Sequence, residues 1–242
     1  MMEIDKQKIL DYYEDQYKNG RVWTEEEYYV WITNMLGDIK DCKILDVGCG
    51  NGEMLKAIEQ NGGQPYGIEI TLTALKNARN TTPSSALILA SAEETPFKNN
   101  FFDHIIFAGV FEHVFSEERS LEELHRILKD NGKVIFVVPN KHWLGKPLEK
   151  VAQPLAWLFR KIVGRKHIGR QLIDREYTIK GFNSLIEKKG FEAIDWRPYQ
   201  IDIGLVKNRK YYLKLLSKNL VPAKLCNHHV FICRKQLKEK NK

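Results

Sequence analysis

Three glycines spaced two residues apart mark the first place in this chain where a ligand could bind. Gly48, Gly50 and Gly52 follow a short apolar run at residues 43–47 and precede apolar residues at helical spacing. Strand, turn and helix junctions of this kind use glycine because the backbone adopts positive φ there, and because a Cβ would block a ligand lying against the turn. The segment therefore predicts a binding turn for a nucleotide-like ligand at the end of a buried strand.

Two acidic residues beside this turn restrict the choice of ligand. Dinucleotide-binding turns have the pattern Gly-x-Gly-x-x-Gly and hold a pyrophosphate at the helix N-terminus. Here the third glycine, Gly52, comes one position early, and Glu53 stands in the first turn of the helix. A carboxylate there complements the helix dipole but repels a pyrophosphate. Together with Asp46 at the end of the strand, Glu53 favours a ligand that has a positive centre and no phosphate.

A glutamate and a histidine follow a later strand, predicted at residues 101–108. Gly109 leads from that strand into Glu112 and His113. The carboxyl ends of central strands are where α/β folds gather their chemistry. Because an imidazole can take up a proton near neutral pH, His113 is our candidate general base, with Glu112 beside it. A structural role for His113 in fixing the loop stays open as the alternative.

The combination Asp46-x-Gly48-x-Gly50-x-Gly52 resembles the first motif of class I S-adenosylmethionine-dependent methyltransferases. Later segments resemble the motifs of that family in the same order, over residues 44–191. The Glu-His-Val triplet at residues 112–114 is similar to that of the ubiquinone-type and related small-molecule methyltransferases. The resemblance implies S-adenosyl-L-methionine as the cofactor, a sulfonium that carries an amino acid and an adenosine without phosphate.

The resemblance also implies which residues hold this cofactor. Glu69 lies nineteen residues after Gly50, where a carboxylate accepts hydrogen bonds from a ribose diol, although this position alone does not separate nicotinamide from adenosylmethionine. Ser91 replaces the acid that usually contacts the adenine amino group, so that contact would be weaker or made by backbone. The residues assigned to the cofactor are Asp46, Gly48, Cys49, Gly50, Gly52, Glu69, Ile70, Ser91, Ala92, Glu93, Ala108 and Gly109.

No metal is assigned to the site. In quinone O-methyltransferases the stretch that resembles residues 108–113 reads Ser-Glu-x-x-Glu-His, whose two acids and histidine can hold a divalent ion. This chain has Ala108 and Gly109 at the first two positions and lacks the first acid. The cysteines and histidines between Cys226 and Cys233 would point to opposite faces of a strand, so we do not expect them to share an ion.

The elements expected between these motifs predict an α/β protein with a Rossmann-like class I methyltransferase fold. Its sheet would have seven mostly parallel strands with an antiparallel last strand, and helices on both faces. Residues 1–242 are expected to form a single domain, with residues 1–40 as a helical N-terminal cover. A helix is predicted at residues 116–131, with Gly132 as its stop. The cover carries residues that would contact the cofactor or simply pack on the sheet: Tyr12, Tyr13, Tyr17 and Arg21.

The positive charge of the chain is confined to one segment. The net charge is +7, yet residues 141–175 hold nine Lys or Arg against two acids, which leaves 29 of each in the rest of the chain. Apolar residues at helical spacing within it predict a basic amphipathic insertion or lid over residues 141–177. Such a segment could contact an anionic membrane, cover the active site or form a dimer surface. No nucleic-acid-reading motif accompanies the charge, so no nucleic-acid partner is expected.

Composition suggests a cytoplasmic location. A hydrophobic content of 43% and a charged content of 29% are typical of a soluble globular protein. No apolar run is long enough to span a bilayer, the first residues are too charged for a secretory signal, and four scattered cysteines do not indicate a disulfide framework. Peripheral contact with the inner face of the membrane stays open through the basic segment.

These observations predict an S-adenosylmethionine-dependent methyltransferase that acts on a small-molecule or lipid-like acceptor, by O-methylation. Two alternatives stay open. One is a non-catalytic cofactor-binding protein that docks on a membrane or partner through residues 141–175. The other is an NAD-dependent oxidoreductase, which Glu53 and the early Gly52 disfavour. The acceptor and the oligomeric state are not indicated by the sequence.

Overall fold

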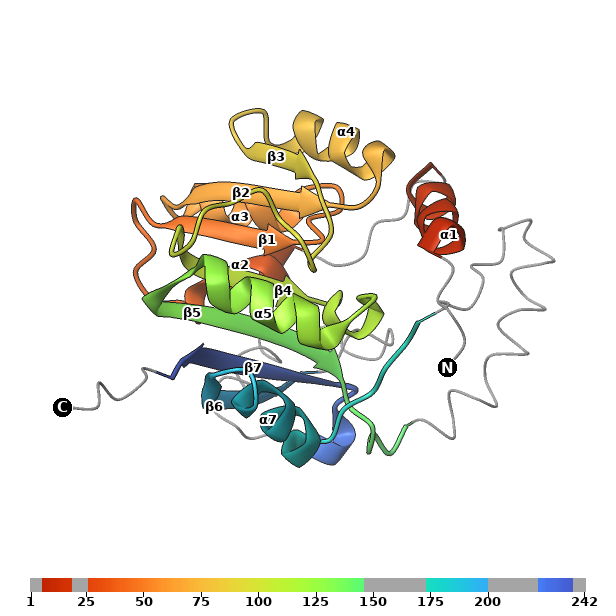
Figure 1. Ribbon diagram of the computed structural model, residues 1–242, viewed down its shortest axis with the longest axis vertical. Coiled ribbons are helices and arrows are strands. Elements are labelled where there is room, and N and C mark those ends of the chain that lie inside the picture. The colour runs from red at the N-terminus through yellow and green to blue at the C-terminus, as the bar shows by residue number, and fades with distance from the viewer. Residues whose placement is uncertain (1–5, 19–25, 146–172, 200–221, 237–242) are drawn as a thin grey trace.

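A sheet of seven strands runs through the part of the chain that the computed structural model describes, which is residues 6–18, 26–145, 173–199 and 222–236. The strand order is β3-β2-β1-β4-β5-β7-β6 (Figure 1). β7 is antiparallel to β5 and β6, whereas the other pairings are parallel. The predicted sheet is thereby confirmed. The strands are β1 Lys43–Val47, β2 Gln64–Glu69, β3 Ala86–Leu89, β4 Phe102–Ala108, β5 Leu128–Pro139, β6 Phe191–Tyr199 and β7 His228–Lys235.

Helices cover both faces of the sheet, as predicted (Figure 1). On one face, Phe107 of β4 and Phe136 of β5 belong to an apolar layer to which α5 and α7 contribute Leu124 and Phe182. On the other face, a second layer lies beneath α2, α3 and α4. Central strands contribute to both layers because successive side chains of a strand point to opposite faces. The helices are α2 Glu26–Asn34, α3 Glu53–Gln60, α4 Leu72–Thr81, α5 Glu117–Ile127 and α7 Ile179–Glu187.

The parallel register places three candidate segments at one edge of the sheet. Asp46 at the end of β1 pairs with Gly67 of β2 and with Ile106 of β4. The glycine turn, Glu69 and the chain that follows Ala108 therefore leave the sheet side by side, at its carboxyl edge. This is the edge where α/β folds bind their ligands.

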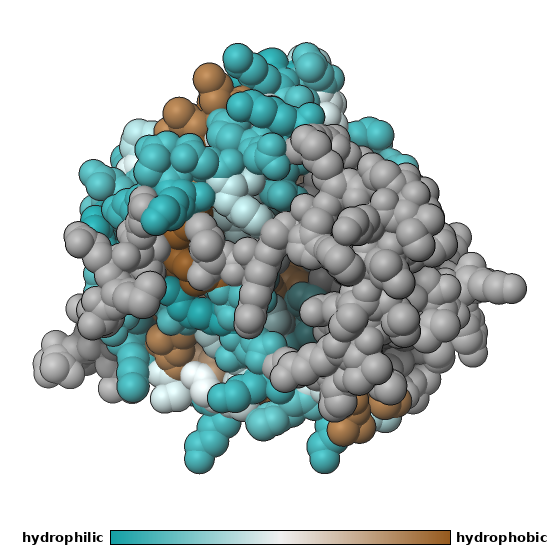
Figure 2. All heavy atoms as spheres, turned by 90° about the vertical axis from the view of Figure 1, so that its right-hand side faces the viewer, coloured by the Kyte–Doolittle hydropathy of each residue, from teal (hydrophilic) through white to brown (hydrophobic). Residues whose placement is uncertain are grey.

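The first helix, α1 Lys6–Lys18, lies beyond this carboxyl edge rather than on a face of the sheet (Figure 1). Within residues 1–40 the structure describes two helices, α1 and α2, whereas residues 35–40 lie in turns and irregular structure. Figure 2 looks onto the same edge, where the described residues are mostly hydrophilic, with hydrophobic atoms visible deeper between them and in small groups at the upper and lower margins. Of the predicted insertion at residues 141–177, residues 146–172 lie outside the described residues.

The helix predicted at residues 116–131 is too long, and its predicted stop is wrong. α5 ends at Ile127, and β5 begins at Leu128. The buried Leu128 already belongs to the sheet. A Cβ on Gly132 would lie 2.5 Å from the Leu128 side chain and 2.7 Å from the carbonyl oxygen of Asp103. Gly132 thus permits a close approach within the strand instead of ending a helix.

None of the helices in the described residues is long and apolar enough to cross a membrane.

Candidate functional site

The glycine turn adopts the conformation that its sequence predicts. Gly48, Gly50 and Gly52 have φ values of 70°, 52° and 92°. The N–H groups of Gly48 and Cys49 both donate to the carbonyl oxygen of Ile68, at 2.8 and 3.0 Å. These bonds tie the turn to the end of β2. Side chains on such left-handed residues would be strained, which explains why glycine is used.

Three acidic side chains surround the turn: Asp46, Glu53 and Glu69. Asp46 and Glu69 are 4% and 5% exposed. Burial, and then the charges of Glu53 and Glu69, raise the pKa of Asp46 well above its ordinary value. Burial also raises the pKa of Glu69. Because the charges of Glu53 and Glu69 disfavour the ionisation of Asp46, a positive group placed among the three acids would be bound favourably.

The carboxylate of Glu69 is held against the turn by four hydrogen bonds. Its Oε2 accepts from the N–H of Gly50 at 3.2 Å. Its Oε1 accepts from the N–H groups of Ile70 and Thr71, at 2.8 and 3.1 Å, and from the Thr71 hydroxyl at 3.1 Å. These hydrogen bonds oppose the effect of burial on the pKa of Glu69. Since Oε1 already has three donors, a ribose hydroxyl would have to donate to Oε2, beside Gly50.

Two of the predicted cofactor residues, Gly109 and Cys49, differ in how much of them a ligand at this edge could contact. Gly109 follows β4 with a φ of 70°, and a Cβ there would meet no atom within 4 Å, so the space beside it is open. Cys49 is buried, and its Sγ lies 2.8 Å from where a Cβ on Gly67 would stand. Its side chain therefore packs in the core, and only its backbone could face a ligand.

The loop predicted to surround the adenine follows β3. Ser91 forms an isolated bridge with Glu94. Ala92 is buried in the apolar layer beneath α5. Glu93 Oε1 accepts from the N–H of Ser116 at 3.1 Å, so this carboxylate is directed toward the start of α5. The loop thus contacts the start of α5, and both of its predicted polar residues, Ser91 and Glu93, keep partly exposed side chains.

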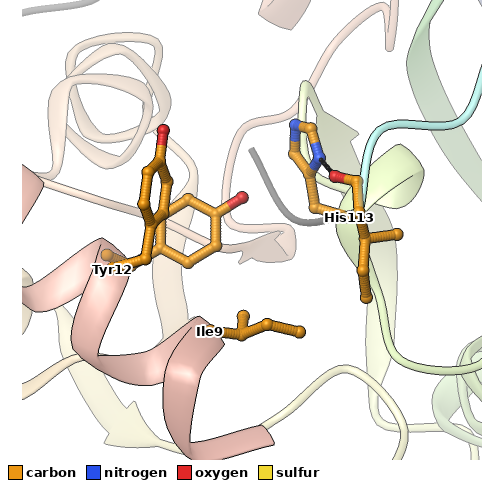
Figure 3. A pocket seen from close by; sticks show the side chains of 5 residues that line it. Ile9, Tyr12 and His113 are labelled. Carbon is orange, nitrogen blue, oxygen red and sulfur yellow. Dashed lines mark hydrogen bonds between the residues drawn. The ribbon is translucent and has the colours of Figure 1, made fainter. Parts of the chain in front are cut away.

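His113 ends the short 3₁₀ helix η1 Phe111–His113, which follows β4. Its Nδ1 lies 2.5 Å from the carbonyl oxygen of Ile173 (Figure 3). A carbonyl oxygen can only accept a hydrogen bond, so Nδ1 carries a proton, and in the neutral ring the lone pair is on Nε2. Nε2 lies 3.6 Å from Oε1 of Glu112. This is the tautomer that a general base acting through Nε2 requires.

Glu112 is buried at the base of the same turn, with an exposed fraction of 3%. Burial raises its pKa to about 8, and the charge of Asp174 acts in the same direction. Its Oε2 has no hydrogen-bond partner within the described residues. At neutral pH the carboxyl is therefore mostly protonated, so Glu112 and His113 lie side by side without forming an ion pair.

Arg175 fixes η1 through hydrogen bonds to its backbone carbonyl groups. Its N–H donates to the carbonyl oxygen of Glu112 at 3.2 Å, and its Nη1 donates to that of Val114 at 2.8 Å. Two residues later, Tyr177 forms a bridge with Asn140. The described ends of the basic insertion are thus joined to each other and to the turn that carries His113.

Side chains of α1 face His113 across a small hollow. Figure 3 shows Ile9 and Tyr12 opposite His113, and Tyr13 and Ile173 also line this hollow. The rings of Tyr13 and His113 have centroids 6.3 Å apart. The N-terminal helix therefore forms the wall of this hollow that faces His113.

The same helix reaches the glycine turn. A Cβ on Gly50 would lie 2.9 Å from the Tyr17 hydroxyl, and burial and the nearby Glu69 raise the pKa of that phenol. Sequence reasoning named Tyr17 but missed Glu14, whose Oε1 accepts from the N–H of Leu72 at 2.7 Å. A contact between residues 58 positions apart cannot be predicted from a local sequence pattern. Arg21, the other candidate from this cover, lies outside the described residues.

Among the described residues, no group of three or more His, Cys, Asp and Glu side chains is arranged to hold a metal ion.

Known proteins share this fold and its motifs. The family profile described as a methyltransferase domain matches residues 45–136. Uncharacterized protein MJ1252 of Methanocaldococcus jannaschii is 32% identical over 203 residues, which cover 77% of this chain and 74% of that protein. The ubiquinone/menaquinone biosynthesis C-methyltransferase UbiE of Cupriavidus taiwanensis is 30% identical over 187 residues, which cover 70% of this chain and 75% of UbiE.

A solved structure extends the similarity to nearly the whole fold. Magnesium protoporphyrin IX methyltransferase of Synechocystis PCC 6803, with bound SAH, has a TM-score of 0.65 and 13% identity, with coverage of 96% of this chain and 100% of that one. These similarities exclude the nicotinamide oxidoreductase and the non-catalytic protein as alternatives. The chain belongs to the class I S-adenosylmethionine-dependent methyltransferases and is an enzyme that methylates a small molecule, with S-adenosyl-L-methionine as its cofactor.

Proposed function

We propose that this enzyme transfers the methyl group to a hydroxyl of a small-molecule or lipid-like acceptor, with His113 as the general base. The observation that carries the proposal is the hydrogen bond from His113 Nδ1 to the Ile173 carbonyl oxygen. It makes Nε2 the basic nitrogen, on a turn at the carboxyl end of β4. Methyl transfer to a hydroxyl needs such a base because the oxygen must lose its proton as the new bond forms.

The residues proposed to hold the cofactor fit its charge and shape. Asp46, Glu53 and Glu69 provide the negative surroundings that a sulfonium and an ammonium group require. Glu69 Oε2 can accept a ribose hydroxyl beside Gly50, and the space beside Gly109 is open. When bound, the cofactor supplies a methyl group already activated for transfer. The protein then has to position the acceptor and remove one proton.

In the proposed reaction, Nε2 of His113 takes the hydroxyl proton while the acceptor oxygen bonds to the methyl carbon. The resulting imidazolium keeps its hydrogen bond to Ile173. Its positive charge, 3.6 Å from Glu112, lowers the pKa of that carboxyl. Glu112 can then release its proton to water and stabilise the imidazolium as a carboxylate. Glu112 thus assists the base through its change of charge.

C-methylation is the second candidate, because the similar UbiE proteins are named as C-methyltransferases. Removal of a phenolic proton at His113 would also activate a ring carbon next to the hydroxyl. The experiment is a screen of phenols and cell extracts with cofactor that carries a ¹³C-labelled methyl group, followed by NMR of the product. A methyl ether supports our proposal, whereas a methyl group bonded to carbon would replace it with the second candidate.

We further propose that residues 1–242 act as one domain in the cytoplasm, with residues 141–175 in peripheral contact with an anionic membrane. The support is the concentration of positive charge in this segment and its apolar residues at helical spacing. Residues 146–172 lie outside the described residues. Roles as a lid or as a dimer surface are the alternatives, and a vesicle flotation experiment distinguishes membrane contact from them. No nucleic-acid partner is proposed.

A further inference from the structure

Four successive backbone N–H groups, at residues 70–73, donate to only two carboxylates. The first two donate to Oε1 of Glu69, at 2.8 and 3.1 Å. The next two donate to Oε1 of Glu14, at 2.7 and 3.4 Å. Glu69 ends β2, whereas Glu14 comes from α1. The loop between β2 and α4 is therefore held at its start by Glu69, the candidate ribose contact, and at its end by Glu14 of the N-terminal helix.

Glu14 completes a helix end that lacks its own cap. Thr71 is the N-cap residue of α4, but its hydroxyl donates to Glu69 and makes no cap hydrogen bond. The N–H groups in the first turn of a helix need an acceptor from elsewhere, and a negative charge is favoured there. Glu14 supplies both, and hydrogen bonds from Thr73 and Leu72 lower its pKa, so that it is ionised.

Glu14 lies between the two tyrosines by which α1 covers the site. Tyr17, one turn later, lies over Gly50 on the cofactor half. Tyr13, the preceding residue, lies beside His113 on the acceptor half. Because a helix moves as one unit, the contact of Glu14 with α4 sets the position of both aromatic side chains.

We propose that Glu14 is a positioning residue that docks α1 on α4 and so closes the cofactor and acceptor halves of the site together. Glu69 and Glu14 share the loop at residues 70–73, so a cofactor that binds at Glu69 also stabilises the docked position of α1. By reciprocity, docking of α1 raises the affinity for the cofactor, and we expect this gain to appear mainly as slower release. The inference depends on cofactor binding and not on the nature of the acceptor, so it goes beyond the proposed reaction.

The test compares Glu14→Ala and Glu14→Gln with Asp11→Ala, which removes an exposed acid of the same helix that accepts a hydrogen bond from Gln7 of α1. Dissociation of S-adenosylhomocysteine is followed by stopped-flow displacement, and hydrogen exchange is measured over residues 6–18. Loss of a helix cap should speed dissociation about five- to tenfold in Glu14→Ala. Glu14→Gln keeps an acceptor oxygen without the charge and should show a smaller increase. Asp11→Ala should match the wild type.

Exchange of the α1 amides should rise in Glu14→Ala while that of β1, β4 and β5 stays unchanged. A Glu14→Ala protein with wild-type dissociation and wild-type exchange of α1 would overturn the proposal. If Glu14→Ala exchanges faster throughout the sheet, the variant is destabilised as a whole, and the test then uses Glu14→Gln. A wild-type dissociation rate in a folded Glu14→Gln protein would likewise overturn the proposal. A lower melting temperature alone, with dissociation unchanged, would assign Glu14 a purely structural role.

Discussion

The hydroxyl of Tyr17 lies so close to Gly50 that a Cβ at Gly50 would stand 2.9 Å from it. The two residues come from α1 and from the turn between β1 and α3, so this approach joins the N-terminal helix to the cofactor turn. Glu69 contacts the same turn through the N–H of Gly50. Conformation and close packing therefore both require glycine at this position.

Gly50→Ala should weaken S-adenosylhomocysteine binding by about tenfold or more, since an added methyl must displace Tyr17 or the turn. Gly37→Ala is the matched control, because Gly37 also has positive φ, 91°, but has no atom within 4 Å of its Cβ position. Both variants should lose about 1 kcal/mol of stability from backbone strain. Calorimetric titration measures the affinity. Equal affinities in the two variants would contradict the assignment of Gly50.

Glu69→Gln should lower the affinity for S-adenosylhomocysteine by about tenfold, because hydrogen bonds to a charged acceptor are the stronger ones. The variant keeps a carbonyl oxygen but loses the charge that fixes the turn through Gly50. Calorimetry on Glu59→Gln, an exposed acid at the end of α3, provides the control. Should Glu69→Gln bind as tightly as the wild type, Glu69 would not be a ribose contact.

The buried Glu112 should make stability depend on pH. Its pKa is raised from 4.5 to about 8, so the native state holds a proton that the unfolded state releases in that interval. The contribution of Glu112 to the free energy of unfolding is fully present below pH 4.5 and is lost as pH rises through about 8. Between these values the free energy of unfolding falls by up to about 1.4 kcal/mol per pH unit. Urea unfolding of the wild type and Glu112→Gln across this window measures it. The stability of the variant relative to the wild type should rise with pH, and a constant difference would refute the shifted pKa.

Membrane contact through residues 141–175 should appear as flotation of the enzyme with vesicles that contain anionic lipids, and salt should weaken it. A variant without these residues should stay at the bottom of the gradient. If the full chain fails to float, or the shortened one floats equally well, the segment is not a membrane contact and its role as a lid or a dimer surface gains support.

Much of the fold was predictable because the strands and helices that build it have strong periodic patterns. The glycine turn, Glu69 and the Glu112–His113 pair lie at one edge because parallel strands align their carboxyl ends. The end of α5 was not predictable, since Gly132 resembles a helix stop and only the packing of Leu128 and Asp103 shows its actual role.

The parts of the site that depend on long-range contacts also lay beyond the sequence. Glu14 contacts the N-terminus of α4, 58 residues away, and the tautomer of His113 depends on a backbone oxygen 60 residues later. Every residue has a backbone carbonyl oxygen, so the sequence does not show which one His113 contacts. A glutamate on an exposed helix cannot be distinguished by sequence from an acid that contacts only solvent. Only the three-dimensional arrangement distinguishes them.

The central claim is that His113 removes a hydroxyl proton during methyl transfer, and a single-turnover rate measurement tests it most directly. His113→Asn can still donate to the Ile173 carbonyl oxygen but offers no base, whereas His125→Asn changes a histidine that packs on Phe191, away from the turn. We predict that His113→Asn slows methyl transfer to the identified acceptor by about 10²- to 10⁴-fold with unchanged affinity for S-adenosylhomocysteine, and that His125→Asn does not. A wild-type rate in His113→Asn would contradict the account.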